Sequence, residues 1–479
     1  MANKRRSGVL MHISSLPGNY SVGSFGSEAR HFVDYLSSAG FSLWQVLPFC
    51  MTDECNSPYK SASAFGGNPY FIDLPTLYEQ GLLTSEELKA AEQRSTYLCE
   101  FDRLASERLP LLYKAAMRVL DRTEVIDFVE SRPKLCQAAE FMALREANRN
   151  RPWQEWTVEE AELDTLFFWQ FIQYQFYNQW MRLKEYANSR GVSIIGDMPI
   201  YVALDSADVY WSREQFLLDG RGYPTSVAGV PPDYFSEDGQ LWGNPLYDWR
   251  SMAKDGYSWW RQRLEFTLEM FDGVRIDHFR GLESYWSVPA HAKSAKEGKW
   301  VKGPGRRLVD ALRSVAGDKL IIAEDLGDVT EEVNALRRYS GFSGMRVIQF
   351  AFLGDPKTPH LPHHFTADAV AYTGTHDNNT LLGYVWELDP HTRAEVFEYC
   401  GAPDTDFNRG CQAIIRTLMA SVADTVILPM QDLLIFGRDT RMNTPGTESS
   451  NWAWRLTPTQ LKGLEAEGFM RMNRLFGRR

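Results

Sequence analysis

The chain has 479 residues, which is enough for about three domains of average size or for one enlarged catalytic barrel. Hydrophobic residues make up 44% of it and charged residues 24%, so a packed core is expected and a disordered chain is excluded. The net charge of -11 argues against nucleic acid as a partner, and no apolar stretch approaches the ~18 residues that span a bilayer. We therefore expect a compact protein with neither a nucleic-acid partner nor a membrane partner.

Short apolar runs bounded by polar or Gly/Pro-rich segments are typical of buried strands, and in chain order they occupy residues 8–16, 41–47, 192–198, 273–277, 319–324, 345–350, 369–373 and 425–428. Helical spacing lies between most of them, at residues 28–39, 166–189, 257–270, 306–315, 331–339 and 406–422, and a last helix is expected over 457–475. The crossover through residues 356–364 shows no convincing helix.

This alternation predicts an α/β protein built on a (β/α)8 TIM barrel, in which parallel strands close into a cylinder surrounded by helices. Periodicity alone also allows an open, doubly wound sheet. The sequence has no G-x-G-x-x-G motif that would favour the nucleotide-binding form of that alternative.

Two long segments interrupt the alternation. Residues 51–164 carry charged amphipathic patterns, which predict a mostly helical subdomain inserted after the second strand. Residues 201–250 are rich in Asp, Gly, Pro and aromatic residues and predict an inserted loop or subdomain after the third strand. The barrel then consists of residues 1–50 and 165–479. An insertion after a barrel strand lies at the C-terminal face, where barrel enzymes carry their catalytic residues.

The cysteine and aromatic residues further limit the kinds of site and ligand that we expect. Six scattered cysteines without a C-x-x-C pair suggest neither a zinc site nor a disulfide framework, and they suit the reducing cytoplasm. Several of the 15 Trp, 21 Tyr and 27 Phe residues fall in Gly/Pro-rich segments that we interpret as loops. Most aromatic side chains serve packing, but in loops their flat rings suit stacking on sugars or nucleobases. The acidic balance favours sugars.

Acidic residues stand at the C-terminal ends of three predicted strands: Asp277, Glu324 and Asp377. Side chains alternate along a strand, so Arg275 and Asp277 face the same side, and a guanidinium keeps a neighbouring carboxylate ionised. Glu324 ends an apolar run, where desolvation raises the pKa of a carboxyl group and favours a general acid. An ionised Asp beside a protonated Glu is the arrangement that cleaves glycosidic bonds.

Each of these acids has alternative interpretations. An acidic residue at a strand end is often a helix cap or a loop ion pair. A second alternative is a metal site, because His12, His278 and His376 lie near strand ends with acids close by. No metal-binding spacing such as H-E-x-x-H occurs, and we expect neither a metal nor a cofactor.

At these segments the sequence resembles the 4-α-glucanotransferases, or amylomaltases, a family related to the α-amylases. The resemblance covers nearly the whole chain, and the joint order of its motifs makes it specific. The motifs are Ser14-Ser-Leu-Pro17, Trp44-Gln-Val-Leu-Pro48, Ser57-Pro-Tyr59, Gly66-Gly-Asn-Pro69, Gly196-Asp-Met-Pro-Ile200, Asp205-Ser-Ala-Asp208, Gly229-Val-Pro-Pro-Asp-Tyr-Phe235, Trp242-Gly-Asn-Pro245, Arg275-Ile-Asp-His-Phe-Arg-Gly281, Trp300-Val-Lys-Gly-Pro-Gly305, Ala323-Glu-Asp-Leu-Gly327, Gly374-Thr-His-Asp-Asn378 and Arg441-Met-Asn443.

The resemblance implies a role for each candidate residue. Asp277 would be the nucleophile, Glu324 the general acid/base, and Asp377 the residue that stabilises the distorted sugar. The implied sugar-binding residues are Arg275, His376 and Asp205 in the cleavage subsite, Tyr59 stacked on that sugar ring, and Tyr234, Phe235 and Trp242 on the acceptor side. The family also lacks the C-terminal β-domain of α-amylases, which agrees with a last helix that follows the eighth strand.

Departures from the family pattern occur at Tyr210, at residues 435–440 and at Ser450, and they bear on loop shape and chain-length preference. The expected activity is transfer of an α-1,4-glucan segment to the 4-hydroxyl of glucose or of a maltooligosaccharide. Two rival functions remain open: an amylase-type hydrolase with the same acids, and a non-catalytic glucan-binding protein. The oligomeric state is left open.

Overall fold

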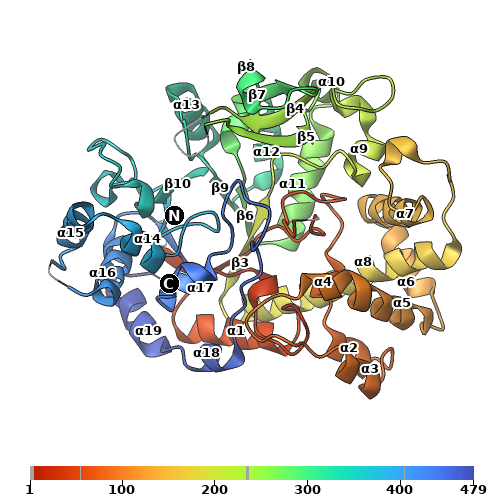
Figure 1. Ribbon diagram of the computed structural model, residues 1–479, viewed down its shortest axis with the longest axis horizontal. Helices are drawn as coiled ribbons and strands as arrows, with labels where there is room; N and C mark the ends of the chain where they lie inside the picture. The colour runs from red at the N-terminus through yellow and green to blue at the C-terminus, as the bar shows by residue number, and fades with distance from the viewer. Residues whose placement is uncertain (1–4, 54, 233–236, 404, 479) are drawn as a thin grey trace.

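A closed barrel of eight parallel strands forms the centre of the protein, whose computed structural model describes residues 5–53, 55–232, 237–403 and 405–478 (Figure 1). Around the barrel the strands follow the order β1, β12, β11, β10, β9, β6, β3, β2. Their bounds are β1 Arg6–Leu10, β2 Leu43–Gln45, β3 Ser193–Met198, β6 Gly273–Ile276, β9 Leu320–Ala323, β10 Ser343–Val347, β11 Ala369–Tyr372 and β12 Thr425–Pro429. The prediction of a (β/α)8 barrel is confirmed, and the open sheet is excluded because β1 pairs with both β2 and β12.

The barrel strands are buried on both faces, as parallel strands covered by helices must be. This explains why they appear in the sequence as continuous apolar runs, and also why two predicted ends were wrong. The strand predicted over 8–16 ends at Leu10, and the one predicted over 345–350 ends at Val347; a 3-10 helix follows each. Ile13 and Ile348 beyond these ends are as buried as the strands, so hydrophobicity does not mark where the backbone turns.

Helices cover the outside of the barrel where the apolar spacing predicts them. They are α1 Ser27–Ser38, α8 Leu163–Ser189, α11 Ser258–Met270, α12 Arg306–Ala316, α13 Glu331–Ser340 and α16 Phe407–Ala420. Between β10 and β11 the described chain has only 3-10 turns. The helix predicted over 457–475 is two helices, α18 Pro458–Lys462 and α19 Ala466–Leu475, because α18 ends at Gly463. Two unpredicted helices, α14 Leu381–Glu387 and α15 Pro390–Tyr399, precede α16, and α17 Met430–Leu433 follows β12.

Between β2 and α8 the chain forms a set of short helices, seen in orange and yellow on the right of Figure 1. They are α2 Leu74–Glu79, α3 Ser85–Ala90, α4 Phe101–Arg103, α5 Leu109–Met117, α6 Thr123–Glu130 and α7 Pro133–Ala147, with a π-helical turn at Leu104–Arg108 between α4 and α5. The capping box of Thr84 and Glu87 starts α3, and Asp73 caps α2. Helices thus occur where the amphipathic patterns predict them, while the division of residues 51–164 into a separate subdomain stays a prediction.

After β3 the chain forms α9 Ala207–Trp211 and α10 Trp249–Lys254, and between them lies part of an antiparallel sheet that the sequence did not predict. The sheet has the strand order β5, β4, β7, β8, with β4 Ser226–Val230, β5 Gln240–Pro245, β7 Ser284–Pro289 and β8 Lys299–Lys302. It lies at the top of Figure 1. It joins the segment after β3 to the segment after β6. Strand β5 contains Gly and Pro and is partly exposed, so it lacks the apolar run of a barrel strand.

None of the helices in the described ranges combines the length and the apolar character that a bilayer crossing requires.

Candidate active site

Asp277 follows the last residue of β6, and its backbone N–H donates to the carbonyl of Met198 on β3 at 3.0 Å. The buried guanidinium of Arg275 donates through Nη2 to Asp277 Oδ1 at 2.9 Å. Through Nη1 it also contacts both carboxylate oxygens of Asp197, at 2.8 Å each. One cation thus joins two carboxylates on neighbouring strands.

Arg275 remains charged in this position. Burial acts to lower the pKa of its guanidinium, but the charges of Asp197 and Asp277 outweigh burial and raise that pKa well above its usual value. The guanidinium at 2.9 Å fixes the direction of the Asp277 carboxylate. A carboxylate nucleophile requires such a fixed direction toward the carbon that it attacks.

Glu324 follows β9 directly and lies beside β6, since its backbone N–H donates to the carbonyl of Ile276 at 3.0 Å. Its carboxylate accepts the backbone N–H of His278 at 2.6 Å and that of Leu326 at 3.2 Å. Burial raises the pKa of Glu324 to about 7, with the charge of Arg275 acting against it. Near neutral pH this carboxyl group therefore holds its proton about half of the time, as a residue that alternates between acid and base must.

Asp377 lies in the loop between β11 and α14. Its Oδ1 accepts the side-chain amide of Asn443 at 2.6 Å, and its Oδ2 lies 3.3 Å from Nε2 of His376. Desolvation acts to raise the pKa of Asp377, but His376 and the Asn443 amide outweigh it and hold that pKa below its usual range. Arg441 donates to the backbone carbonyl of Asp377 at 2.6 Å. Asp377 is thus ionised, and His376, Asn443 and Arg441 hold it in place.

All three acids lie close enough to Arg275 for its charge to act on them, namely on Asp277, Glu324 and Asp377. Tyr59 lies at the same place, because its hydroxyl donates to Asp197 at 2.8 Å. Burial raises the pKa of that hydroxyl, and the charges of Asp277 and Asp377 act in the same direction. Side chains from the ends of β6, β9 and β11 and from the loop after β2 therefore converge at the C-terminal face of the barrel.

An aromatic wall stands beside the acids. The rings of Tyr59 and His376 stack at 5.1 Å with an interplanar angle of 18°. Trp452 lies 5.9 Å from Tyr59 and 5.7 Å from His376, centroid to centroid. Since His376 covers one face of Tyr59, a sugar stacked on this tyrosine would have to use the other face.

Trp242 of β5, which the resemblance assigns to the acceptor side, packs edge-on against His278 at 5.0 Å, and His278 immediately follows Asp277. Burial lowers the pKa of His278 to about 4, so this ring is neutral. The unpredicted antiparallel sheet thus carries an aromatic side chain to the rim next to Asp277. Tyr234 and Phe235, which the sequence assigns to the same side, lie outside the described residues.

Asp205 lies in the segment between β3 and α9. Its carboxylate contacts Nε of Arg145 at 3.1 Å and accepts the backbone N–H of Trp153 at 3.2 Å. Both partners belong to the helical insertion, so Asp205 joins that insertion to the segment after β3. Its role in sugar binding stays a prediction.

Several residues of the site were not assigned a role from the sequence, namely Asp197, Arg441, Asn443 and Trp452. Asp197 had a signal, because a carboxylate inside the apolar run of β3 needs a buried partner. Asn443 and Arg441 stand in the Arg441-Met-Asn443 motif, but nothing in their spacing points to Asp377.

The metal-site alternative finds no support in this geometry. Burial lowers the pKa of His12 to about 3, and its Nδ1 accepts the backbone N–H of Leu47 at 3.2 Å. Throughout the described ranges, His, Cys, Asp and Glu form no group of three or more that could hold a metal ion.

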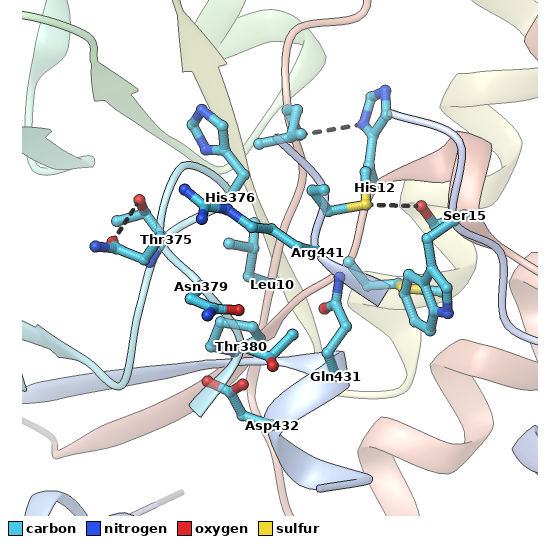
Figure 2. A pocket seen from close by; sticks show the side chains of 16 residues that line it. Leu10, His12, Ser15, Thr375, His376, Asn379, Thr380, Gln431, Asp432 and Arg441 are labelled. Atoms are coloured by element: carbon cyan, nitrogen blue, oxygen red, sulfur yellow. Dashed lines mark hydrogen bonds between the residues drawn. The ribbon is translucent and has the colours of Figure 1, made fainter. Parts of the chain in front are cut away.

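Beneath His376 lies a small cavity of about 20 Å³, between the ends of β1, β11 and β12 (Figure 2). It is lined by Leu10, Met11, His12, Ser15, Leu47, Thr375, His376, Asn378, Asn379, Thr380, Pro429, Gln431, Asp432, Arg441, Met442 and Trp454. A volume of this size holds about one water molecule, so it is too small for a sugar ring. The cavity lies behind the substrate site and is not part of it.

Comparison with known proteins gives one consistent result. Residues 11–461 match the family model described as 4-alpha-glucanotransferase. The chain is 44% identical to the 4-alpha-glucanotransferase of Streptococcus pneumoniae, over 99% of this chain and 98% of the relative. It is also 44% identical to the enzyme of that name from Thermus thermophilus, over 95% and 96% of the two chains. Its fold is similar to the amylomaltase from Streptococcus agalactiae in complex with acarbose, with a TM-score of 0.94, 37% identity and coverage of 99% and 100%.

Proposed function

The chain belongs to the 4-alpha-glucanotransferase family and acts on α-1,4-glucans, and from this premise we propose that Asp277, Glu324 and Asp377 perform the transfer by a retaining double displacement. The observation that carries the proposal is the bridge of Arg275 between Asp197 and Asp277, because it leaves an oriented carboxylate beside Glu324, a carboxyl group whose pKa is about 7. One acid is prepared to attack and the other to donate a proton.

In the first displacement Asp277 attacks the anomeric carbon of the donor glucan while Glu324 gives its proton to the departing glycosidic oxygen. The bond from the anomeric carbon to that oxygen breaks, and a bond to the Asp277 carboxylate forms. The shortened glucan leaves with the proton as a free 4-hydroxyl. Glu324 is now ionised.

In the second displacement Glu324 takes the proton from the 4-hydroxyl of an acceptor sugar, which attacks the same carbon and releases Asp277. Two inversions at one carbon retain the α-configuration. The negative charge of Asp377 is suited to stabilise the oxocarbenium-like transition state in both steps. Arg275 and His376 border the same space, and we assign them to binding of the reacting sugar.

Transfer has to compete with hydrolysis by water at ~55 M, and a bound, oriented acceptor does this because effective molarities of about 10⁵ M or more are reached in well-positioned reactions. The proposed acceptor side is formed by Trp242 and the loop containing Tyr234 and Phe235. A rim of aromatic side chains holds the face of a sugar ring and excludes solvent from the covalent intermediate.

The test is incubation of the protein with maltotriose, followed by separation of the products. Transfer yields a ladder of longer maltooligosaccharides together with glucose. Shortening of the substrate without any product longer than maltotriose would contradict transfer and support the amylase-type hydrolase. Retention of the substrate on the protein with no product at all would support a glucan-binding protein.

We also propose that the protein works in the cytoplasm. The structure has free thiols at Cys50, Cys99, Cys136, Cys400 and Cys411, and burial raises the pKa of each. A reducing compartment keeps thiols in this free state. Localisation of a tagged full-length chain by cell fractionation tests this assignment.

A further inference from the structure

Asp432 is a buried acid that the proposed mechanism does not use. It lies in α17, directly after β12, and only 1% of its surface is exposed. Within the described part of the chain it has no ion-pair partner, and burial raises its pKa to about 6. A buried carboxylate without a cation is costly, so its hydrogen bonds indicate why the position carries an acid.

The two oxygens of Asp432 hold the two ends of one loop. Oδ2 accepts the hydroxyl of Thr373 at 2.5 Å, and Oδ1 accepts the backbone N–H of Leu381 at 2.7 Å. Thr373 follows the last residue of β11, and Leu381 is the first residue of α14. The residues between them include His376 and Asp377, so one carboxylate closes the loop that carries both.

Contacts inside the loop transmit this constraint to Asp377. Asn378 accepts both the backbone N–H and the hydroxyl of Thr375 at 2.9 Å, and Thr375 in turn accepts the backbone N–H of Asp377 at 3.3 Å. Gln349 donates to the carbonyl of Asn379 at 2.9 Å. The loop is therefore held by hydrogen bonds within it and by the bonds of its two ends to Asp432.

Gln431, the residue before Asp432, contacts the second segment that surrounds Asp377. Gln431 donates to the carbonyl of Thr440 at 3.1 Å, and Thr440 precedes Arg441 and Asn443, the two side chains that donate to Asp377. Helix α17 thus holds both the loop that carries Asp377 and the segment that orients it.

Close packing alone does not fix the loop, because the 20 Å³ cavity lies against it. Figure 2 shows His376 above and Asp432 below, with Asn379 and Thr380 between them. A cavity large enough for one water molecule packs the loop less tightly than side chains would. The hydrogen bonds to Asp432 therefore contribute to the position of the loop.

We propose that Asp432 is a positioning residue for the transfer reaction, which sets the place of His376 and Asp377 against the reacting sugar by holding Thr373 and Leu381. It acts through the loop and does not touch the substrate. Alanine at this position removes both acceptor oxygens, whereas the amide of asparagine could still accept from Leu381 and donate to the hydroxyl of Thr373.

The test compares variants that remove or retain these hydrogen bonds. Asp432→Ala and Thr373→Val each remove the bond between the two side chains, whereas Thr373→Ser retains the hydroxyl. Asp73→Ala is the matched control, because Asp73 is also a buried helix-capping acid, but it caps α2 in the helical insertion. All variants are assayed for kcat and KM with maltotriose, after thermal unfolding has shown that they are folded.

We expect Asp432→Ala to lower kcat by about 10- to 100-fold, since a displacement of about 1 Å at a reacting group has an effect of this order. Thr373→Val should lower kcat by about 10-fold, and KM should stay within about 3-fold in both, as for an interaction that matters in the transition state. Thr373→Ser should restore activity. The double variant should be no worse than Asp432→Ala alone, because that change already removes the bond to Thr373.

Wild-type kcat in Asp432→Ala or in Thr373→Val would overturn the proposal. So would an equal loss in Asp73→Ala, which would reflect the removal of any buried acid, or a rise in KM with kcat unchanged, which would indicate weaker ground-state binding. If Asp432→Ala does not fold, the comparison of Thr373→Val with Thr373→Ser decides alone.

Discussion

Asp277 and Glu324 lie on one side of the proposed active site and Asp377 on the other, and different parts of the chain hold the two sides. The first pair follows barrel strands directly, and the backbone of each is bonded to the neighbouring strand, at 3.0 Å to Met198 and to Ile276. Asp377 lies on a loop, and its partner Asn443 is 66 residues away in the sequence.

This difference separates two ways of placing a catalytic group. Barrel strands cannot shift without breaking the sheet, so the pair on β6 and β9 is rigid with the fold. The loop depends on side chains from the C-terminal part of the chain, so single substitutions far from the chemistry should affect it. The comparison predicts that substitutions on the strand side cause large losses of activity and that those on the loop side cause graded losses.

The largest effect is expected from Asp277→Asn, which removes the nucleophile and should lower turnover of maltotriose by about 10³-fold or more. Glucan binding should persist, because the side-chain volume is unchanged. Turnover is measured by the product ladder, and binding by retention on immobilised amylose. Full activity in this variant would show that the nucleophile is another residue.

Glu324→Gln should lower activity on natural glucans by about 10²- to 10⁴-fold. A donor with fluoride as leaving group needs no proton, so α-glucosyl fluoride should still form the covalent intermediate, and mass spectrometry should find it on Asp277. In the wild type, kcat/KM for maltotriose should fall as the pH rises through about 7, where Glu324 loses its proton.

The same pKa predicts how stability depends on pH. The folded-state pKa of Glu324 is about 7 and its ordinary value is about 4.3, so the folded protein keeps this proton where the unfolded chain has released it. The contribution of Glu324 to stability therefore falls as the pH rises through that window. Chemical denaturation between pH 4 and 8 should show a flatter dependence in Glu324→Gln, and an unchanged slope would refute the assigned pKa.

Asp197→Asn should have an intermediate effect. It leaves the buried Arg275 with Asp277 as its remaining close carboxylate, and breaking a buried ion pair costs about 3 kcal/mol of folding free energy. We expect kcat to fall by about 10- to 100-fold, because the guanidinium can then turn away from its present position. Denaturant unfolding measures the stability and maltotriose assays the rate. A stable variant with normal kcat would mean that Asp277 is oriented without Arg275.

The smallest effect is expected from Asn443→Ala, on the loop side. It removes the 2.6 Å hydrogen bond to Asp377, so the pKa of Asp377 should rise and kcat should fall by about 10-fold. Assays with maltotriose measure the fall in kcat. If Asn443→Ala were as damaging as Asp277→Asn, the contrast between the rigid and the adjustable side would not hold.

Much of the fold could be predicted because its determinants are local. Barrel strands such as β9 are apolar runs of strand length, and helices such as α13 show one apolar face, so both follow from nearest-neighbour patterns. Asp277, Glu324 and Asp377 stand just beyond such runs, which places them at one face of any barrel. The antiparallel sheet escaped prediction because β4 pairs with β7 across the intervening residues 231–283 and β5 is partly exposed.

The sequence by itself thus determined the strands, the helices between them and the position of three acids at their ends, since each depends on residues adjacent in the chain. Only the tertiary structure decided that Arg275 meets Asp197, that Asn443 meets Asp377 and that Asp432 meets Thr373. These are single hydrogen bonds between distant segments. They have no period in the sequence, and they exist only because closure of the barrel brings the segments after its strands to one rim.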